Sequence, residues 1–159
     1  MIRGSRLVNF MAAGMLLLLV SCEKGPYFSE VRNFKNNVWE AKDQQKFEVE
    51  ITDTSVLYDI IFFLRVDTDY DYNNAWIYLH STLPDKKEYK EAHQFFISNE
   101  NGEWLGKKSG SLVESEMIFS GRKFPQAGKY KFVIEQATTQ KRLSHISDVG
   151  LKIIKSKKS

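Results

Sequence analysis

Apolar and charged residues alternate along two short segments, and this alternation constrains the fold more than any other feature of the chain. In residues 46–51 and again in residues 130–135, nearly every second residue is apolar, as in Tyr130, Phe132 and Ile134. Successive side chains of a β-strand point to opposite faces of its sheet, so a period of two is typical of a strand with one buried face. Both segments therefore predict half-buried β-strands.

Five further segments predict strands from their composition. Residues 57–66 are apolar on both faces, which indicates a central strand. A buried helix shares that signature, but the many β-branched and aromatic side chains favour a strand. The dipeptide Asn101-Gly102 tolerates positive φ and predicts a tight turn. The remaining predicted strands are residues 75–80, 94–98, 111–119 and 149–155.

Seven or eight short strands without interleaved helices predict an all-β fold, which we expect to be a single antiparallel β-sandwich or jelly-roll-like domain. Two segments give weaker signals. Apolar residues within 27–38 have helical spacing, but the Asn residues among them disfavour a helix. We expect an extended segment there, with room for one helical turn, ending where Trp39 joins the core. Residues 136–148 are polar, and we expect a helical turn around Leu143 and Ile146.

The first 22 residues have the features of an export signal followed by a lipid anchor. Arg3 and Arg6 precede 14 mostly apolar residues, 7–20. A transmembrane helix needs about 20 apolar residues, so this stretch is too short to span a bilayer and is typical of a signal peptide. It ends in Leu-Val-Ser-Cys, the pattern of a bacterial lipobox. We expect cleavage between Ser21 and Cys22, a diacylglycerol on the thiol, and acylation of the freed amine by a fatty acid such as palmitate.

This interpretation divides the chain into four parts and makes the membrane its first partner. Two or three acyl chains on Cys22 would hold the protein on a bilayer almost permanently. The expected parts are a removed lipoprotein signal peptide (1–21), a membrane tether and N-terminal extended segment (22–38), a β-sandwich domain (39–155) and a basic tail (156–159).

Charge and cysteine content exclude several classes of protein. The chain has 23 Lys and Arg against 20 Asp and Glu, and loss of the signal peptide removes two Arg, so the mature chain is near neutral. A near-neutral chain is not expected to bind nucleic acid. The single Cys excludes a disulfide scaffold and a CxxC zinc site, and its lipidation would exclude thiol catalysis.

No motif indicates catalysis, a cofactor or a small-molecule substrate, so we expect no enzyme activity and assign no metal site. His80, His93 and His145 lack the spacing of metal ligands. The alternating acids of residues 67–73 are similar to the start of an EF-hand loop. That loop requires Gly at its sixth position and Glu at its twelfth, where this chain has Tyr72 and Tyr78. An EF-hand is excluded, while a looser calcium site stays open beside an ordinary acidic turn.

Four aromatic residues lie at or beside predicted turns and form a candidate interaction surface. Tyr and Trp are enriched at binding hot spots, which favours a contact with a partner. The alternative is packing in the core, and the sequence does not distinguish the two. The four residues are Tyr70, Tyr72, Trp76 and Trp104.

Several motifs together resemble the gliding-motility lipoprotein GldH family, found in gliding bacteria of the Bacteroidota. The resemblance covers essentially the whole mature chain, and its most specific parts are NGEWLGK at 101–107 and DVGLKI at 148–153. The other parts are the lipobox Cys, Val38-Trp39, NAWI at 74–77 and GKYKF at 128–132.

The resemblance implies a lipid-anchored accessory protein of the cell envelope that is needed for gliding and the associated protein secretion. It implies no enzymatic activity, and contacts with other envelope proteins of that machinery are expected. The residues after Cys22 lack a run of acids, so we expect the periplasmic face of the outer membrane, with the inner membrane as the alternative. The alternative function is a glycan- or peptidoglycan-binding module, because exposed Trp and Tyr on a β-sandwich suit sugar stacking.

Replacing Cys22 with Ala is predicted to prevent lipidation and to leave a heavier precursor that keeps its signal peptide. The lipobox chemistry needs the thiol, and cleavage follows its modification. Mass spectrometry of the N-terminal peptide checks this prediction, and an unmodified Cys22 thiol in the mature wild-type protein would contradict it.

Overall fold

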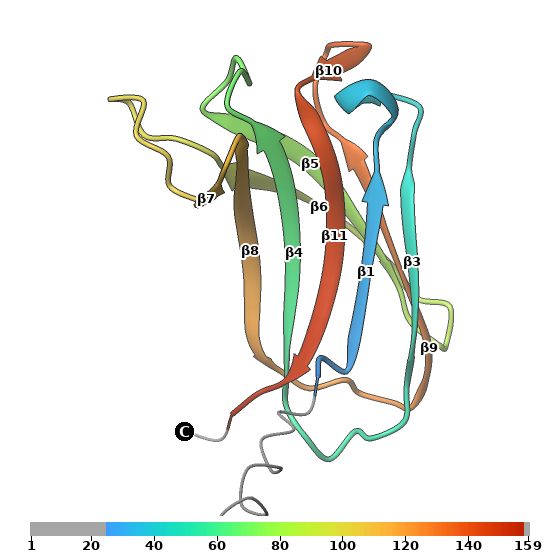
Figure 1. Cartoon of the computed structure of the whole chain (residues 1–159). Helices are drawn as coiled ribbons and strands as arrows, with labels where there is room; N and C mark the ends of the chain where they lie inside the picture. Colours follow the sequence, from blue (N-terminus) through green and yellow to red (C-terminus); the bar gives the residue numbers. More distant parts are fainter. Residues whose placement is uncertain (1–24, 158–159) are drawn as a thin grey trace, which may run out of the picture.

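The domain is an antiparallel β-sandwich, which confirms the predicted fold class (Figure 1). The computed structural model describes residues 25–157, so the signal peptide, Ser21 and Cys22 lie outside the described residues. Within residues 25–157, no helix has both the length and the apolar character needed to cross a membrane.

Eleven strands are found in the described residues, against the seven or eight expected. They are β1 (Phe28–Asn33), β2 (Val38–Glu40), β3 (Gln45–Ile51), β4 (Tyr58–Asp67), β5 (Asn74–Thr82), β6 (Glu88–Phe96), β7 (Lys107–Ser109), β8 (Leu112–Arg122), β9 (Gly128–Gln136), β10 (Arg142–Ser144) and β11 (Ile146–Lys155).

Two sheets form the layers of the sandwich. One has five strands in the order β1-β11-β4-β8-β7, and the other has four in the order β3-β9-β5-β6. A two-stranded ribbon of β10 and β2 lies at one end. All named strand pairs are antiparallel. The first and last strands of the domain, β1 and β11, are neighbours, so the two ends of the domain meet in the same sheet.

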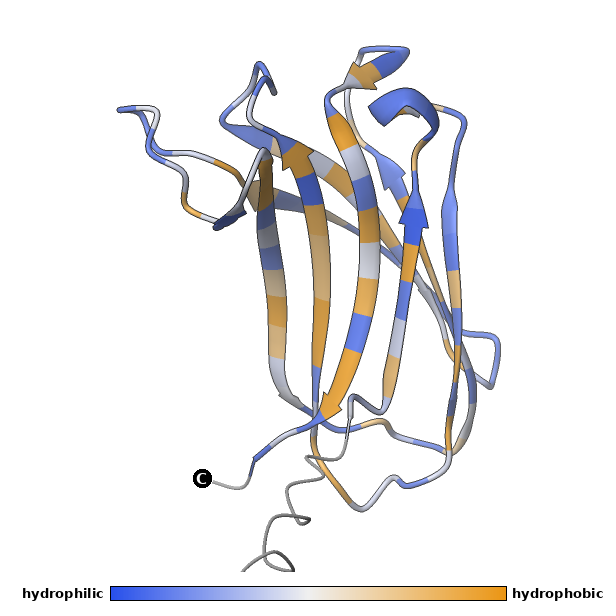
Figure 2. Cartoon of the chain, in the orientation of Figure 1, coloured by the Kyte–Doolittle hydropathy of each residue, from blue (hydrophilic) through white to orange (hydrophobic). Residues whose placement is uncertain are grey.

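The alternating segments pack as predicted, with their apolar residues facing the core. Phe47 of β3 and Ile134 of β9 are completely buried, and Phe132 packs edge-on against Phe62 of β4 with ring centroids 5.8 Å apart. Figure 2 shows hydrophobic and hydrophilic residues alternating along β3 and β11, whereas β4 is hydrophobic along most of its length.

Strand β4 is buried on both faces, as expected of a central strand. Phe62 faces the core, and Phe63 lies on the outer face, where it is only 5% exposed. Gly150 of β11 makes room for Phe63, because a Cβ at position 150 would lie 2.0 Å from Cζ of that ring. The guanidinium of Arg65 covers the same ring at 4.9 Å. A side chain at position 150 would therefore displace the outer aromatic ring of the central strand.

The ribbon of β2 and β10 closes one end of the core around Trp39. Trp39 is fully buried and stacks on Phe34 with ring centroids 4.9 Å apart. The Trp39 indole donates a hydrogen bond to the carbonyl of Asp43 (2.8 Å). The backbone carbonyl of Trp39 accepts a hydrogen bond from the side-chain amide of Gln136 (2.9 Å). The expected helical turn in 136–148 is wrong. The segment instead forms β10 and the start of β11, because Leu143 pairs opposite Trp39 and is buried with it.

The extended segment with one helical turn expected in residues 27–38 is found there, as strand β1 followed by a short 3-10 turn, Lys35–Asn37. The pairing of β1 with β11 in the five-stranded sheet was not expected. The ordered sandwich therefore begins well before Trp39. The strand expected at residues 94–98 is longer at its start. It is β6, which begins at Glu88, because residues 88–93 also pair with β5.

Both termini of the described domain lie at the same end of the sandwich, because β1 and β11 are antiparallel neighbours (Figure 1). We call this the tether end. It comprises the terminal residues, the loops joining β3 to β4, β5 to β6 and β8 to β9, and the flanking strand ends: residues 25–28, 51–58, 82–88, 122–128 and 155–157.

Replacing Phe132 with Asp is predicted to destabilise the domain by more than about 3 kcal/mol, because it removes a core ring and buries a carboxylate. Lys131→Asp is the matched control. Its side chain points to the outer face, so we expect a loss below about 1 kcal/mol. Denaturant unfolding of both variants checks the strand register, and equal losses would contradict it.

Candidate interaction surface on the four-stranded sheet

The structure separates the four aromatic residues selected from the sequence. Tyr70 is buried and donates a hydrogen bond from its hydroxyl to the carbonyl of Asn74 (3.1 Å). Trp104 is partly buried and packs against the core. Tyr72 and Trp76 are each 44% exposed. Of the four, only Tyr72 and Trp76 therefore offer a large aromatic surface to a partner.

Trp76 is exposed because aliphatic residues take the inner positions of β5. Ala75, Ile77 and Leu79 are buried, and Trp76 and Tyr78 alternate with them on the outer face of the four-stranded sheet. The smaller aliphatic side chains fill the space between the sheets, which leaves the aromatic residues of this strand on the outside.

Two further aromatic residues extend the surface around Trp76. Tyr78 is two residues along the same face and is 37% exposed, and Phe96 of β6 is 60% exposed. Trp76 pairs opposite Gln94, so Phe96 lies diagonally across from it, within reach of an aromatic side chain. We call Trp76, Tyr78 and Phe96 the aromatic face. The alternation of 74–80 and the pair Phe95-Phe96 signal these residues in the sequence, but not which of them face outward.

A polar network fixes one edge of the aromatic face. The ammonium of Lys90 lies 4.0 Å from the centroid of the Tyr78 ring and 3.1 Å from a carboxylate oxygen of Glu135. The same carboxylate accepts hydrogen bonds from Gln44 (2.6 Å) and His80 (3.0 Å). Glu135 thereby joins four strands, because Gln44 precedes β3 directly and the other three residues lie on β5, β6 and β9. The network holds Lys90 over Tyr78 and so restricts the motion of that ring.

The acidity of Glu135 reflects this network. Burial by itself raises the pKa of Glu135, but hydrogen bonds from Gln44, His80 and Lys90 outweigh burial and lower the pKa to about 2. The carboxylate is therefore charged at any physiological pH.

A shallow cleft of about 410 Å³ adjoins the network on the side away from Trp76. Tyr89 is its only Phe, Tyr or Trp, and Trp76 and Tyr78 line neither this cleft nor the separate cleft of about 560 Å³ in which Phe96 lies beside Leu105 and Ile118. A flat apolar patch suits a protein surface better than a sugar chain held between rings. The cleft is lined by Gln44, His80, Thr82, Glu88, Tyr89, Lys90, Lys131 and Val133.

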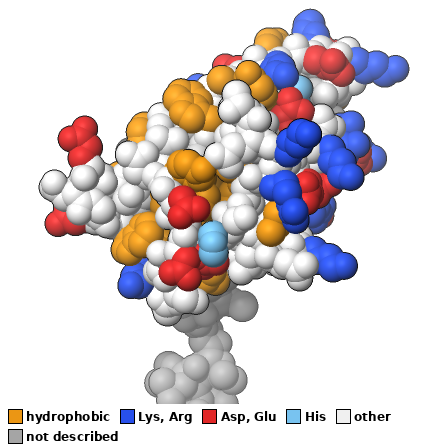
Figure 3. All heavy atoms as spheres, turned by 90° about the horizontal axis from the view of Figure 1, so that it is seen from above, with side chains coloured by type: hydrophobic (Ala, Val, Ile, Leu, Met, Phe, Trp, Pro, Cys, Tyr) orange, Lys and Arg blue, Asp and Glu red, His pale blue; other side chains and the backbone are white. Residues whose placement is uncertain are grey.

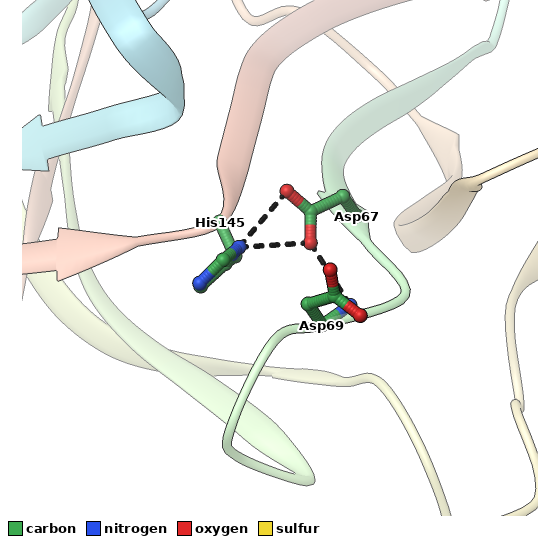
Figure 4. Close-up of side chains that lie close together, drawn as sticks. All are labelled: Asp67, Asp69 and His145. Atoms are coloured by element: carbon green, nitrogen blue, oxygen red, sulfur yellow. Dashed lines mark hydrogen bonds and ion pairs between the residues drawn. The ribbon is translucent and has the colours of Figure 1, made fainter.

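The acidic loop after β4 meets a histidine at the other end of the molecule from the tether. Potential ligand atoms of Asp67, Asp69 and His145 lie within 4.8 Å of one another (Figure 4). The ring Nδ1 of His145 is 3.0 Å from the Asp67 carboxylate, and the backbone N–H of Asp69 donates to the same carboxylate (2.9 Å). The sequence spacing did not reveal this cluster, because His145 is 78 residues from Asp67.

These contacts connect the end of β4 to the start of β11. The backbone N–H of Asp67 also donates to the carbonyl of His145 (2.9 Å), and His145 has a left-handed backbone with φ of 65°. The hydrogen bond to Asp67 raises the pKa of His145 above its ordinary value. Asp67 thus joins the end of β4 to the start of β11 through both its side chain and its backbone.

The three histidines occupy separate places. His80 contacts Glu135, His93 packs edge-on against Phe119 at 5.3 Å, and His145 contacts Asp67. Figure 3, which looks onto the end with the acidic loop, shows acidic and hydrophobic side chains over its left and centre and Lys and Arg along its right. This end therefore combines both signs of charge with apolar patches.

Replacing Glu135 with Gln is predicted to lower the free energy of unfolding by about 1–2 kcal/mol at pH 7, because charged hydrogen bonds are lost. The pKa of Glu135 is about 2 in the folded chain and 4.5 ordinarily. Its charge therefore stabilises the fold above pH 4.5, and that stabilisation is lost as the pH falls from 4.5 towards 2.

Denaturant unfolding of both proteins across this pH range measures the effect, and the difference between wild type and variant should shrink as the pH falls. Glu48→Gln is the control, since Glu48 forms only an exposed ion pair with Lys129 at 3.5 Å. A difference that does not change with pH would contradict the role of the charge.

Comparison with known proteins agrees with the motifs. The sequence model of the GldH lipoprotein family matches residues 26–153. A gliding motility lipoprotein GldH homolog of Christiangramia forsetii is 30% identical over 149 residues, covering 89% of this chain and 91% of that protein. Gliding motility lipoprotein GldH of Flavobacterium johnsoniae is 26% identical over 145 residues, covering 86% of this chain and 89% of that protein.

Likeness to solved structures is weak. The enzymatically active domain of bacteriophage CBA120 tailspike protein 4 aligns with 80% of this chain and 17% of that chain, at 7% identity and a TM-score of 0.34. So weak a likeness carries no argument about function. The sequence matches, in contrast, run through nearly all of the described sandwich, and the chain belongs to the GldH lipoprotein family.

Proposed function

We propose that this protein is a lipid-anchored accessory component of the gliding motility and associated protein secretion machinery, and that it acts by binding another envelope protein through the aromatic face. Membership of the family makes it a motility lipoprotein, which implies an anchored position in the cell envelope, rather than a member of a known enzyme family. The proposed anchor is Cys22, and the proposed location is the periplasmic face of the outer membrane.

The observation that carries the proposal is the exposure of Trp76, Tyr78 and Phe96 together on one sheet face. Exposed large aromatic residues that adjoin one another are typical of protein–protein interaction sites. The Glu135 network restricts Lys90 and Tyr78 before a partner binds, which lowers the entropy lost on association. An anchor also confines the domain near one membrane, so a modest interface can suffice for a partner in the same membrane.

The double variant Trp76→Ala, Phe96→Ala is predicted to abolish gliding in cells that lack the wild-type protein. Both side chains are largely exposed, so the variant should fold, and circular dichroism and membrane fractionation should match the wild type. Gliding speed and the yield of site-specific crosslinks from position 78 to neighbouring proteins are the measurements.

The control is Val31→Ala, which removes an exposed apolar side chain (37%) from β1, at the far edge of the other sheet. A folded, anchored double variant that glides at wild-type speed would refute the placement of the interface. Binding of isolated peptidoglycan that requires Trp76 would instead favour the glycan-binding alternative.

A further inference from the structure

The tether end gathers positive charge from three separate segments, 82–88, 122–128 and 155–157. It carries six Lys and Arg against three acidic residues, and two of the acids are already paired, Asp53 with Lys155 at 3.5 Å and Asp85 with Lys87 at 2.9 Å. Among the described residues, the cations of this end that have no ion pair are Lys86, Arg122, Lys123 and Lys157.

Exposed apolar side chains accompany these cations. Leu57, in the loop before β4, is 49% exposed, and its carbonyl accepts a hydrogen bond from the backbone of Ser156, which places it beside the basic C-terminal residues. An open cleft of about 530 Å³ between the two sheets is lined by Arg122, Lys123 and the 52%-exposed Tyr89, together with buried core rings such as Phe124. Basic side chains around exposed apolar ones are typical of proteins that lie on a bilayer surface.

The opposite end does not have this excess of positive charge. There the loop after β4 carries Asp67, Asp69 and Asp71, and the surface mixes both signs of charge (Figure 3). Because the mature chain is near neutral, an anionic surface attracts the molecule mainly through this asymmetry, and it attracts the tether end.

The length of the chain before the domain keeps the tether end near the membrane. Four residues lie between Cys22 and Tyr27, and the five steps from one to the other span at most about 18 Å. Tyr27 is fastened to the domain, since its hydroxyl donates to the carbonyl of Glu50 (2.7 Å) and its ring packs on Tyr58 with centroids 5.3 Å apart. Electrostatic attraction to headgroups acts over about 8 Å at physiological salt, and a tether with this maximum span allows the basic residues to come within that range.

We propose that the tether end docks on anionic lipid headgroups of the bilayer that holds the anchor, with Arg122, Lys123 and Leu57 in the contact. In this orientation the strands run roughly perpendicular to the membrane, and the aromatic face points sideways, parallel to the membrane surface. This inference rests on the lipid anchor in the proposed function, but it does not depend on which protein the aromatic face binds.

The test uses the complete mature chain with Cys22→Ser, which removes the lipid and leaves only the surface contact. The core lies between Phe34 and Ile153, so the anchor is not part of the fold. Binding to vesicles of phosphatidylcholine, with and without phosphatidylglycerol, is measured by flotation. We expect binding to the anionic vesicles alone, weakened by salt, and lowered about tenfold or more by Arg122→Glu with Lys123→Glu.

The matched control is Lys107→Glu with Lys108→Glu, which makes the same charge change on β7 and leaves the tether end intact. This variant should bind almost as the wild type does. Circular dichroism verifies that both variants fold. Equal weakening by both variants, or no binding of the wild type to anionic vesicles, would overturn the proposal.

A single-site label gives an independent readout. Cys22 is the only cysteine, so Leu57→Cys in the Cys22→Ser chain carries one thiol for an environment-sensitive dye. Anionic vesicles should shift its emission to shorter wavelength, and should not shift a dye at Leu105→Cys, which replaces a 57%-exposed side chain away from the tether end. No shift at position 57, or equal shifts at both, would contradict the orientation. Either failure would leave the gliding test of the aromatic face unaffected.

Discussion

The pairing of the first strand with the last determines how this molecule is organised. Phe28 at the start of β1 lies opposite Ile153 near the end of β11, and β11 pairs in turn with the central strand β4. The sheet is therefore complete only when the whole domain has been brought together, because β1 pairs with residues more than 100 positions further along the chain. The antiparallel sense of the pairing also sends both termini out of the same end, which sets where a lipid anchor attaches to the sandwich.

The local sequence pattern was enough to predict the strands that have one face on the core and the other in solvent. Strands β3 and β9 alternate in the sequence because one side of each lies on the core. The middle of β4 is apolar on both faces, and its outer ring, Phe63, is covered by Arg65. The pattern was ambiguous for β1, whose apolar residues have helical spacing, and it failed for β10. Strand β10 has three residues, and it becomes a strand only because Leu143 meets Trp39 across the ribbon. That contact is tertiary, and no local period signals it.

For the candidate surface, too, the sequence identifies the residue types but not where they lie in the fold. The sequence marks Tyr70, Tyr72, Trp76 and Trp104 as aromatic residues near turns, but exposure depends on which side of a strand each occupies and on what competes for the core. Trp76 points outward because Ala75 and Ile77 fill the inner positions. The network around Glu135 was beyond prediction, because Gln44, His80 and Lys90 come from three separate parts of the chain and meet only when the strands are in register.

The two proposed surfaces complement each other in geometry. The aromatic face lies along the flat of a sheet, and the tether end lies where its strands begin and end, so the two are perpendicular. A domain resting on its tether end would present Trp76, Tyr78 and Phe96 sideways, towards whatever stands beside it in the same membrane. Docking would then remove most of the rotational freedom of a short tether before any partner binds. A partner would meet an aromatic face that is already oriented, so part of the entropic cost of association would be met by the contact with the bilayer.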